Sequence, residues 1–224
     1  MMSNSIFLAG ASKGVGREIA KYLVADKAQV IALLRTEDAR TELEAMGIKV
    51  ILGDALNIMQ VEQAVLGENN LDTVITTIGG LPQIDPKPDY LANKNLIDAA
   101  LKAKVRKFIL ITSIGCGESV VALNPQALET LGSVLVEKEK AEQYLINSGL
   151  TYTIIRPGGL KSEQATGNAI LTSNYQAVGS IHRADVAQFA CRCLASEKTN
   201  NQILSAVDKN MLFTQQEFEE FSLM

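Results

Sequence analysis

The chain has 224 residues, a length typical of one α/β domain. With 47% hydrophobic residues it can bury a large core, and its net charge of −4 argues against a general nucleic-acid-binding protein. No run of about 18 apolar residues occurs, so we expect no membrane span. We also expect no targeting leader, because the first apolar strand begins almost at once.

Cysteine and histidine are too sparse for a metal centre. The three cysteines, Cys116, Cys191 and Cys193, lack the spacing of a disulfide framework or a ligand pair, and His182 is the only histidine. We therefore expect no metal site, three reduced thiols and a reducing, cytoplasmic location. Nothing in the sequence specifies an oligomeric state.

Strand and helix patterns alternate along the chain. Apolar runs predict strands at 6–9, 29–34, 49–52, 73–77, 107–112, 151–155 and 202–206. Helical spacing predicts helices near 14–25, 37–46, 58–66, 90–103, 133–148, 184–194 and 215–222. Thr214 and Glu217 would form a capping box at the start of the last helix. Strands that are apolar on both faces predict a single Rossmann domain over residues 1–224, with a doubly wound, mostly parallel sheet.

A glycine-rich turn follows the first strand and opens the first helix. Gly10 permits a sharp turn, a side chain at Gly14 would obstruct a pyrophosphate, and Gly16 lets the helix pack close to the strand. The backbone N–H groups of the first helical turn would then face the phosphates of a dinucleotide. The alternative is a turn that only connects two elements. The loop residues predicted to bind the cofactor are Gly10, Ser12, Lys13, Gly14, Val15 and Gly16.

The end of the second strand predicts which nicotinamide nucleotide binds. NAD sites typically place a carboxylate there for the ribose 2′-OH, whereas this chain has Arg35 followed by Thr36. A guanidinium can hold a 2′-phosphate through forked hydrogen bonds, and Lys13 adds a second positive charge at this corner. We therefore predict NADP(H) as the cofactor. The alternative is that both cations are ordinary solvated charges.

Several segments resemble the short-chain dehydrogenase/reductase superfamily. GASKGVG (10–16) is similar to the nucleotide loop of its central branch. The rest of the chain resembles the divergent branch, which includes NmrA-like proteins, biliverdin-IXβ/flavin reductases and related plant and cyanobacterial NAD(P)-binding proteins. That branch usually has a glycine where this chain has Lys13. The segments that carry the second resemblance are ALLRT (32–36), GDALN (53–57), FILITSIG (108–115), KEKAEQYLINSGLTYTIIRPGGL (138–160) and HRADVAQFA (182–190).

The resemblance implies further cofactor contacts after the third and fourth strands. Asp54 matches the adenine-binding aspartate of the family, and Ala55 would flank the ring. Alternatively, Asp54 caps the next helix, a role for which Asn57 competes. At the end of the fourth strand the family contacts the cofactor through the backbone, which here involves Thr77, Ile78 and Gly79.

The chain departs from the central branch at the catalytic tyrosine. Those enzymes use a serine, a tyrosine and a lysine, with the tyrosine four positions before the lysine. Lys138 resembles the lysine, but Val134 stands at the tyrosine position. Tyr144 lies more than one turn downstream and is no obvious substitute.

The remaining catalytic candidates are Ser113 and Lys138. Thr112 and Ser113 end the fifth strand, and both are predicted to contact the cofactor, with the Ser113 hydroxyl orienting a substrate. Lys138, supported by a K-x-x-x-E spacing with Glu142, would hold the nicotinamide ribose. The alternatives are a serine that satisfies the strand end and a solvated helix lysine.

The turn after the sixth strand is predicted to lie near the nicotinamide carboxamide. Pro157 stiffens the strand exit, and Gly158 and Gly159 let the backbone approach a flat ring. His182 is a minor candidate for proton transfer. The resemblance assigns the arginine and aspartate that follow it to support of a helix start.

The missing tyrosine favours hydride transfer to an electron-poor conjugated acceptor, whose receiving centre takes its proton from water or a solvent-fed group. The resemblance implies flavins and linear tetrapyrroles, and quinones form a third class. We therefore predict an NADPH-dependent reductase of a flat, conjugated small molecule, with an acceptor pocket shaped by segments 80–90, 114–130 and 160–178. The alternatives are a non-catalytic NADP(H)-binding redox sensor and a scaffold or assembly protein.

Overall fold

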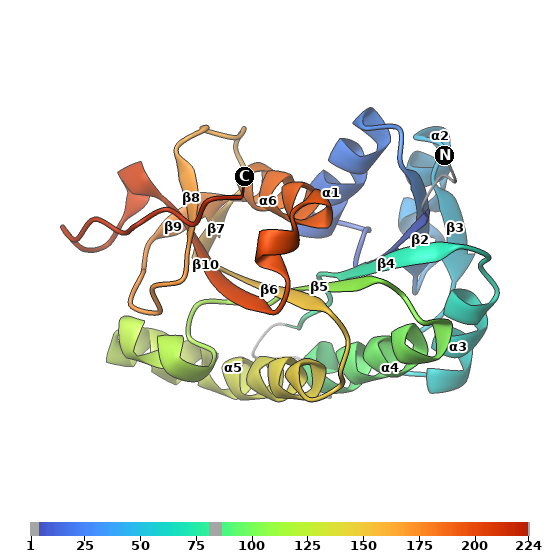
Figure 1. The fold of residues 1–224 in the computed structure, drawn as a ribbon, viewed down its shortest axis with the longest axis horizontal. Helices are drawn as coiled ribbons and strands as arrows, with labels where there is room; N and C mark the ends of the chain where they lie inside the picture. The colour runs from blue at the N-terminus through green and yellow to red at the C-terminus, as the bar shows by residue number, and fades with distance from the viewer. Residues whose placement is uncertain (1–4, 81–86, 224) are drawn as a thin grey trace.

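The computed structural model describes residues 5–80 and 87–223 and forms a three-layer α/β fold (Figure 1). In this part of the chain the main sheet has eight strands in the order β3-β2-β1-β4-β5-β6-β10-β8. Its strands are β1 (Ser5–Ala9), β2 (Gln29–Leu34), β3 (Lys49–Leu52), β4 (Leu71–Thr76), β5 (Lys107–Ile111), β6 (Tyr152–Pro157), β8 (Ala169–Thr172) and β10 (Gln202–Asp208). A second, two-stranded sheet pairs β7 (Gly159–Lys161) with β9 (Ser180–His182).

The sheet is parallel from β3 to β10, and only the edge strand β8 is antiparallel. The chain starts in the middle, at β1, and pairs β1 with β2 on one side and with β4 on the other. The strand order therefore reverses between β1 and β4, where ligands bind in doubly wound sheets. This topology confirms the predicted Rossmann architecture.

Helices cover both faces of the sheet (Figure 1). One face carries α1 and α6, which pack against each other, and the other carries α3, α4 and α5. Each layer buries its own apolar cluster against the sheet. The helices are α1 (Gly14–Ala25), α2 (Arg40–Ala45), α3 (Ile58–Leu66), α4 (Pro88–Ala103), α5 (Pro125–Ile146) and α6 (Arg183–Ala195), with 3₁₀ turns η1 (Glu37–Ala39), η2 (Gly117–Ala122), η3 (Glu197–Thr199) and η4 (Lys209–Met211).

The helix predicted at 215–222 is wrong. This segment is irregular, because tertiary contacts outweigh its capping signal. The side chain of Phe218 is buried in a small cluster with Ile170 and Val207, and the backbone N–H of Phe221 donates to the carbonyl of Leu171 on β8. The chain end therefore lies along the sheet edge.

The segments predicted to shape the acceptor pocket contain helices and strands that the sequence analysis did not predict. Helix α5 starts at Pro125, eight residues before the predicted 133, with Asn124 as a cap that accepts from the backbone N–H of Ala127. Asn followed by Pro is a helix-start signal that the 133–148 prediction overlooked. Strands β7, β8 and β9 lie within or next to the 160–178 segment. Of the 80–90 segment, residues 81–86 lie outside the described residues.

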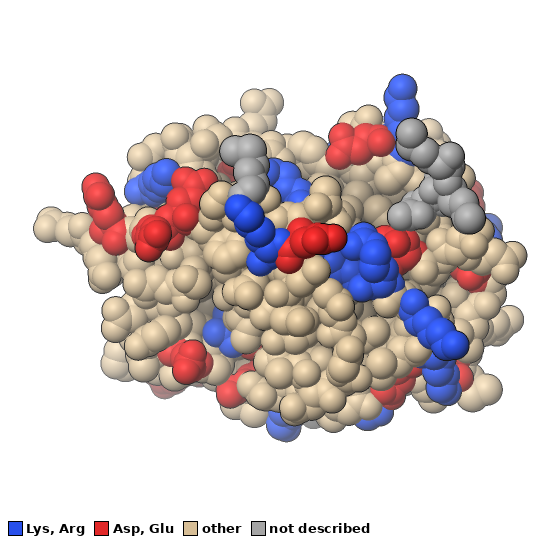
Figure 2. Space-filling model, in the orientation of Figure 1, with Lys and Arg blue, Asp and Glu red and all other residues tan. Residues whose placement is uncertain are grey.

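The surface is mixed in charge on the face shown in Figure 2, where acidic and basic side chains intersperse over largely uncharged surface. None of the helices in the described ranges has both the length and the apolarity that crossing a bilayer requires.

Replacing Gly16 with alanine should destabilise the fold. A Cβ there would lie 2.1 Å from the carbonyl oxygen of Gly10 and 2.7 Å from Thr77 Oγ1, so strand or helix must move. We expect a loss of about 1–3 kcal/mol in the free energy of unfolding, measured by urea denaturation.

The matched control is Gly132→Ala, inside α5, where an added Cβ meets nothing within 4 Å. This change should stabilise the protein by about 0.5–1 kcal/mol, the ordinary gain from alanine over glycine in a helix. Equal behaviour of the two variants would contradict the close-packing role of Gly16.

Candidate functional site

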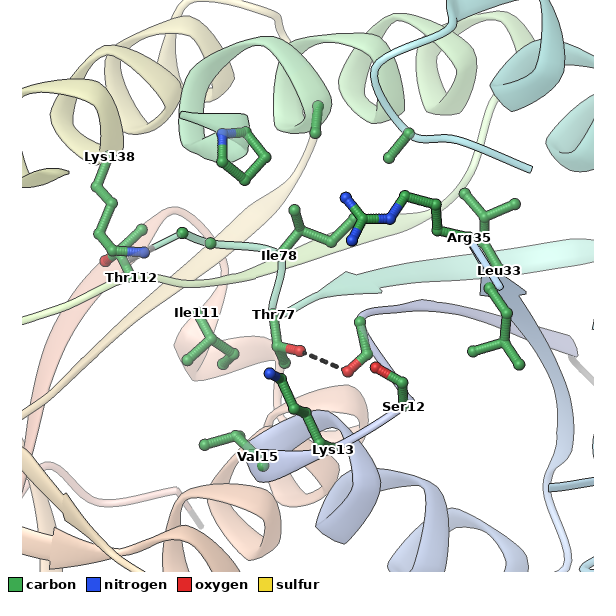
Figure 3. A pocket seen from close by; sticks show the side chains of 18 of the residues that line it. Ser12, Lys13, Val15, Leu33, Arg35, Thr77, Ile78, Ile111, Thr112 and Lys138 are labelled. Carbon is green, nitrogen blue, oxygen red and sulfur yellow. Dashed lines mark hydrogen bonds between the residues drawn. The ribbon is translucent and has the colours of Figure 1, made fainter. Parts of the chain in front are cut away.

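A cavity of about 650 Å³ opens at the carboxyl ends of the strands, over the β1–β4 switch point (Figure 3). Its wall joins the loop before α1, the ends of β2, β3, β4, β5 and β6, and one lysine of α5. The predicted residues that line it are Gly10, Ser12, Lys13, Gly14, Val15, Arg35, Thr36, Asp54, Ala55, Thr77, Ile78, Gly79, Thr112, Ser113, Lys138 and Pro157. The structure thus brings together residues from seven separate segments.

The glycine loop is held by hydrogen bonds on its inner side and faces the cavity on the other. Gly10 and Gly14 have φ angles of +92° and +62°, in the region that favours glycine. Arg17 is buried under the loop, donates to the carbonyls of Ala11 and Ser12 at 3.0 Å each, and pairs with the carboxylate of Glu42. Its charge is therefore committed to holding the loop in shape.

The start of α1 is available to an anion. Lys13 precedes it without a side-chain cap, and the first turn contains no acidic residue. The N–H groups of this turn and the positive end of the helix dipole therefore face the cavity without an internal partner from a capping side chain. Gly16 does not line the cavity; it provides the close contact of α1 with the Gly10 carbonyl, to which Thr77 Oγ1 donates at 3.3 Å (Figure 3).

The end of β2 presents a free cation. Arg35 is exposed at the cavity edge and makes no hydrogen bond or ion pair with the described residues, whereas the next residue, Thr36, donates to Asp38 at 2.9 Å. Lys13 lines the same cavity and has no described ion-pair partner either. Both cations line the same cavity and have no ion-pair partner among the described residues, so they are available to the phosphate groups of NADP(H).

The structure distinguishes the two roles considered for Asp54. Asn57 caps α3, accepting from the N–H groups of Met59 and Gln60, so Asp54 is not the helix cap. One oxygen of Asp54 accepts from the N–H of Leu56 at 2.9 Å, and the residue lines the cavity. It is therefore held in a tight turn at the cavity wall.

Lys138 and Glu142, one helical turn apart on α5, have separate surroundings. Glu142 is fully buried, accepts from Thr112 Oγ1 at 2.6 Å and from Arg156 Nε at 3.1 Å, and forms a second contact of 2.5 Å with Arg156. Burial opposes the charge of Arg156, but Glu142 outweighs it and raises the pKa of the guanidinium. Glu142 thus binds β6 to α5, while Lys138 lines the cavity.

Lys138 is paired with an acid that the sequence analysis missed. The ammonium Nζ lies 2.7 Å from Oδ1 of Asp89, whose side chain is fully buried at the start of α4. Asp89 also accepts from the backbone N–H of Gly80 at 2.9 Å. Asp89 lies 49 positions before Lys138, and its only local signal was Pro88, a residue that favours the first turn of a helix.

Ser113 is half-buried on the cavity wall, and its hydroxyl donates to the carbonyl of Ile114 at 2.9 Å. The interaction matches the strand-end role considered for this serine. It leaves the oxygen lone pairs free to accept, and the hydroxyl can rotate toward a ligand. Both roles therefore remain compatible with its position.

The position of the family tyrosine carries no proton donor. Val134 is buried, and the hydroxyl of Tyr144 donates to Asp98 on α4 at 2.6 Å, away from the cavity wall. The described cavity lining contains no tyrosine, histidine or cysteine. Cys116 is a buried free thiol, and burial raises its pKa to about 12, so it is no thiolate near neutral pH.

Like Gly16, the predicted Gly158 and Gly159 do not line the cavity. A Cβ on Gly158 would lie 2.2 Å from the carbonyl oxygen of Gly179, and Gly159 pairs with Ser180 in the small sheet. Their absence of side chains thus serves strand packing, and their approach to a flat ring stays a prediction. Pro157, which precedes them, does line the cavity.

The segment after β9 places its arginine, and not its histidine, at the cavity. His182 contacts the carbonyl of Gln164 at 2.6 Å and does not line the cavity. Arg183 does, next to Gly14, with its guanidinium donating to Ser162 Oγ at 2.8 Å and to Leu160 O at 3.3 Å. The sequence analysis assigned Arg183 to support of the helix start and did not predict that it lines the cavity.

Residues 10–197 match the model of a family described as NAD(P)H-binding. The chain belongs to this NAD(P)H-binding family. The match agrees with the open N-terminus of α1. It confirms a nicotinamide nucleotide as the cofactor, in agreement with the prediction of NADP(H). When bound, the nucleotide would be held by the glycine loop, with Arg35 and Asp54 at its adenosine end and Lys138 at its nicotinamide end.

Three similar proteins match the chain over most of its length. The structure of anaerobillin reductase ChuY from Escherichia coli O157:H7 is 36% identical, covers 92% of this chain and 98% of its own, and has a TM-score of 0.85. Sanguinarine reductase of Eschscholzia californica is 28% identical, over 88% of this chain and 86% of its own. An uncharacterized chloroplastic protein of Arabidopsis thaliana is 32% identical, over 92% of this chain and 77% of its own.

Replacing Arg35 with aspartate and Lys13 with alanine should weaken NADPH binding far more than NADH binding. The change removes two cations and adds a carboxylate at the predicted 2′-phosphate corner. We expect a loss in NADPH affinity of about 10- to 100-fold, the range of one or two charge-assisted hydrogen bonds. Titration calorimetry with each nucleotide measures it.

Arg192→Asp is the control, because Arg192 is exposed on α6 and does not line the cavity. It should leave both affinities unchanged. An equal loss of NADPH and NADH binding in the double variant would contradict the phosphate-corner interpretation.

Proposed function

We propose that the protein is an NADPH-dependent reductase that delivers hydride to a flat, conjugated acceptor such as a bilin, a flavin or a quinone. The observation that carries the proposal is the composition of the nicotinamide end of the cavity. It has a serine and a lysine but no tyrosine, since Val134 is buried at the tyrosine position and Tyr144 is bound to Asp98. Ordinary ketone reduction would lack its acid there.

Conjugated acceptors suit this arrangement. The cofactor supplies the hydride when bound, and the protein's task is to position the acceptor. A delocalised acceptor spreads the added electron pair over many atoms, so protonation by water can follow without a side-chain acid. The named relatives that are reductases of a bilin and of sanguinarine support this class of acceptor.

Each residue at this end has a chemical role in the proposal. Lys138 provides a fixed positive charge beside the hydride donor, and the N–H groups that do not face Asp89 can bind the nicotinamide ribose. Ser113 forms one hydrogen bond with the hydride-accepting substrate, as donor or as acceptor. Pro157 and Leu160 provide apolar wall for a flat ring system. The preference for NADPH over NADH rests on Arg35 and Lys13.

The missing tyrosine also favours a second function, a non-catalytic NADP(H)-binding sensor or scaffold. A direct assay separates the two. The protein is mixed with NADPH and, in turn, FMN, biliverdin and a soluble quinone, and absorbance at the NADPH band is followed. We expect consumption of NADPH with at least one acceptor; tight NADPH binding without consumption across the panel would support the sensor or scaffold.

Ser113→Ala should lower kcat with the active acceptor by about tenfold, the value of one hydrogen bond that orients the substrate. The measurement is steady-state kinetics at saturating NADPH. Tyr144→Phe is the matched hydroxyl deletion away from the cavity and should leave kcat nearly unchanged. If Tyr144→Phe abolishes turnover while Ser113→Ala does not, the acid has been misplaced.

A further inference from the structure

We propose that Asp89 is a positioning residue of the hydride end of the cavity, which fixes the Lys138 ammonium by charge so that its N–H donors face the cofactor's nicotinamide ribose. The inference deepens the proposed function and rests on it for the role of Lys138. No family pattern in the sequence pointed to this aspartate. It stands on the contacts, burial and crowding around one carboxylate.

The carboxylate is sealed from water. The side chain of Asp89 has no exposed surface, and that of Lys138 is 15% exposed. Burying a carboxylate without a counter-charge costs folding free energy, so the site requires the ammonium at 2.7 Å. Asp89 also lies in the first turn of α4, where the helix dipole favours a negative charge.

The two oxygens of Asp89 have different tasks. Oδ2 accepts from the backbone N–H of Gly80 and so holds residues 77–80, which follow β4. Oδ1 faces the Lys138 ammonium at 2.7 Å, and the described residues give it no other partner. The charge of Lys138 is therefore what balances this oxygen.

The ammonium keeps its donors for a ligand. Within the described ranges, Asp89 is the only side chain in polar contact with the Lys138 ammonium, which lines the cavity. An ammonium has three N–H groups, so those that do not face Asp89 are available to a ligand in the cavity. A ribose diol at the nicotinamide end presents the oxygen acceptors that would complete it.

The surroundings leave the pair little freedom to move. A Cβ on Gly79 would lie 2.5 Å from Lys138 Nζ and 2.8 Å from Asp89 Oδ1, so the backbone passes directly over the ion pair. Asn93 holds the same loop, donating to Ile78 O at 3.2 Å and to Asp89 O at 2.6 Å. Residues 77–80 after β4, the start of α4 and Lys138 are thus held together.

The test is a double-mutant cycle on nucleotide binding with Asp89→Asn, Lys138→Met and the double variant. Asparagine keeps the shape of the side chain and an acceptor for the Gly80 N–H, and it removes only the charge. Each variant is titrated with NADPH and with 2′,5′-ADP, which carries the adenosine end of the cofactor and lacks the nicotinamide ribose. Neither titration needs an acceptor, so the outcome is independent of whether the protein turns over.

We expect Asp89→Asn and Lys138→Met each to weaken NADPH binding about tenfold, with 2′,5′-ADP binding unchanged. The double variant should bind NADPH no more weakly than Lys138→Met alone, because Asp89 acts through the lysine. Wild-type NADPH affinity in Asp89→Asn, or additive losses in the double variant, would overturn the proposal. So would an equal loss of 2′,5′-ADP, since Asp89 would then support the fold of the whole cavity.

Discussion

The close approach of α1 to β1 and β4 is the constraint on which the rest of the structure depends. Gly16 brings the helix backbone against the carbonyl of Gly10, and Thr77 at the end of β4 donates to that same carbonyl. Three elements therefore meet at one oxygen, at the point where the strand order reverses. This contact directs the open N-terminus of α1 into the cavity, and both ends of the site are placed relative to it.

The two ends of the cavity use charge in different ways. At the end proposed for the adenosine, Arg35 is exposed and has no ion-pair partner among the described residues, so water solvates its charge in the absence of a phosphate. At the end proposed for the nicotinamide, Lys138 is paired with the buried carboxylate of Asp89, and Arg156, behind the cavity wall, is paired with that of Glu142. The first arrangement suits selection of a mobile anionic ligand, and the second suits a fixed geometry for chemistry.

The parts of the fold and site that the sequence predicted are those written in local patterns. The strand–glycine–helix segment around Gly14 and the cation at Arg35 each depend on neighbours within a few positions, and the sheet order follows from alternating strands and helices. Asp89 could not be found in this way, because its partner Lys138 is brought near only by the packing of α4 on α5.

Two further differences have the same physical origin. Gly158 has the local signature of a backbone that makes room for a ligand, but it makes room for the carbonyl of Gly179, more than twenty positions later. The capping box at Thr214 is a genuine local preference, and it loses to burial of Phe218 against the sheet edge. In each case a distant contact decides between structures that the local sequence permits equally.

Two residues of α5 that lie one turn apart connect the helix to different layers of the molecule. Lys138 pairs with Asp89 of the neighbouring helix α4, whereas Glu142 contacts Thr112 and Arg156, at the ends of β5 and β6 in the sheet. If α5 shifted or rotated by one residue, the buried carboxylates of Asp89 and Glu142 would both lose their counter-charges. A change in the ligands that this fold binds should therefore come from the loops around the cavity, while the position of Lys138 on α5 stays fixed.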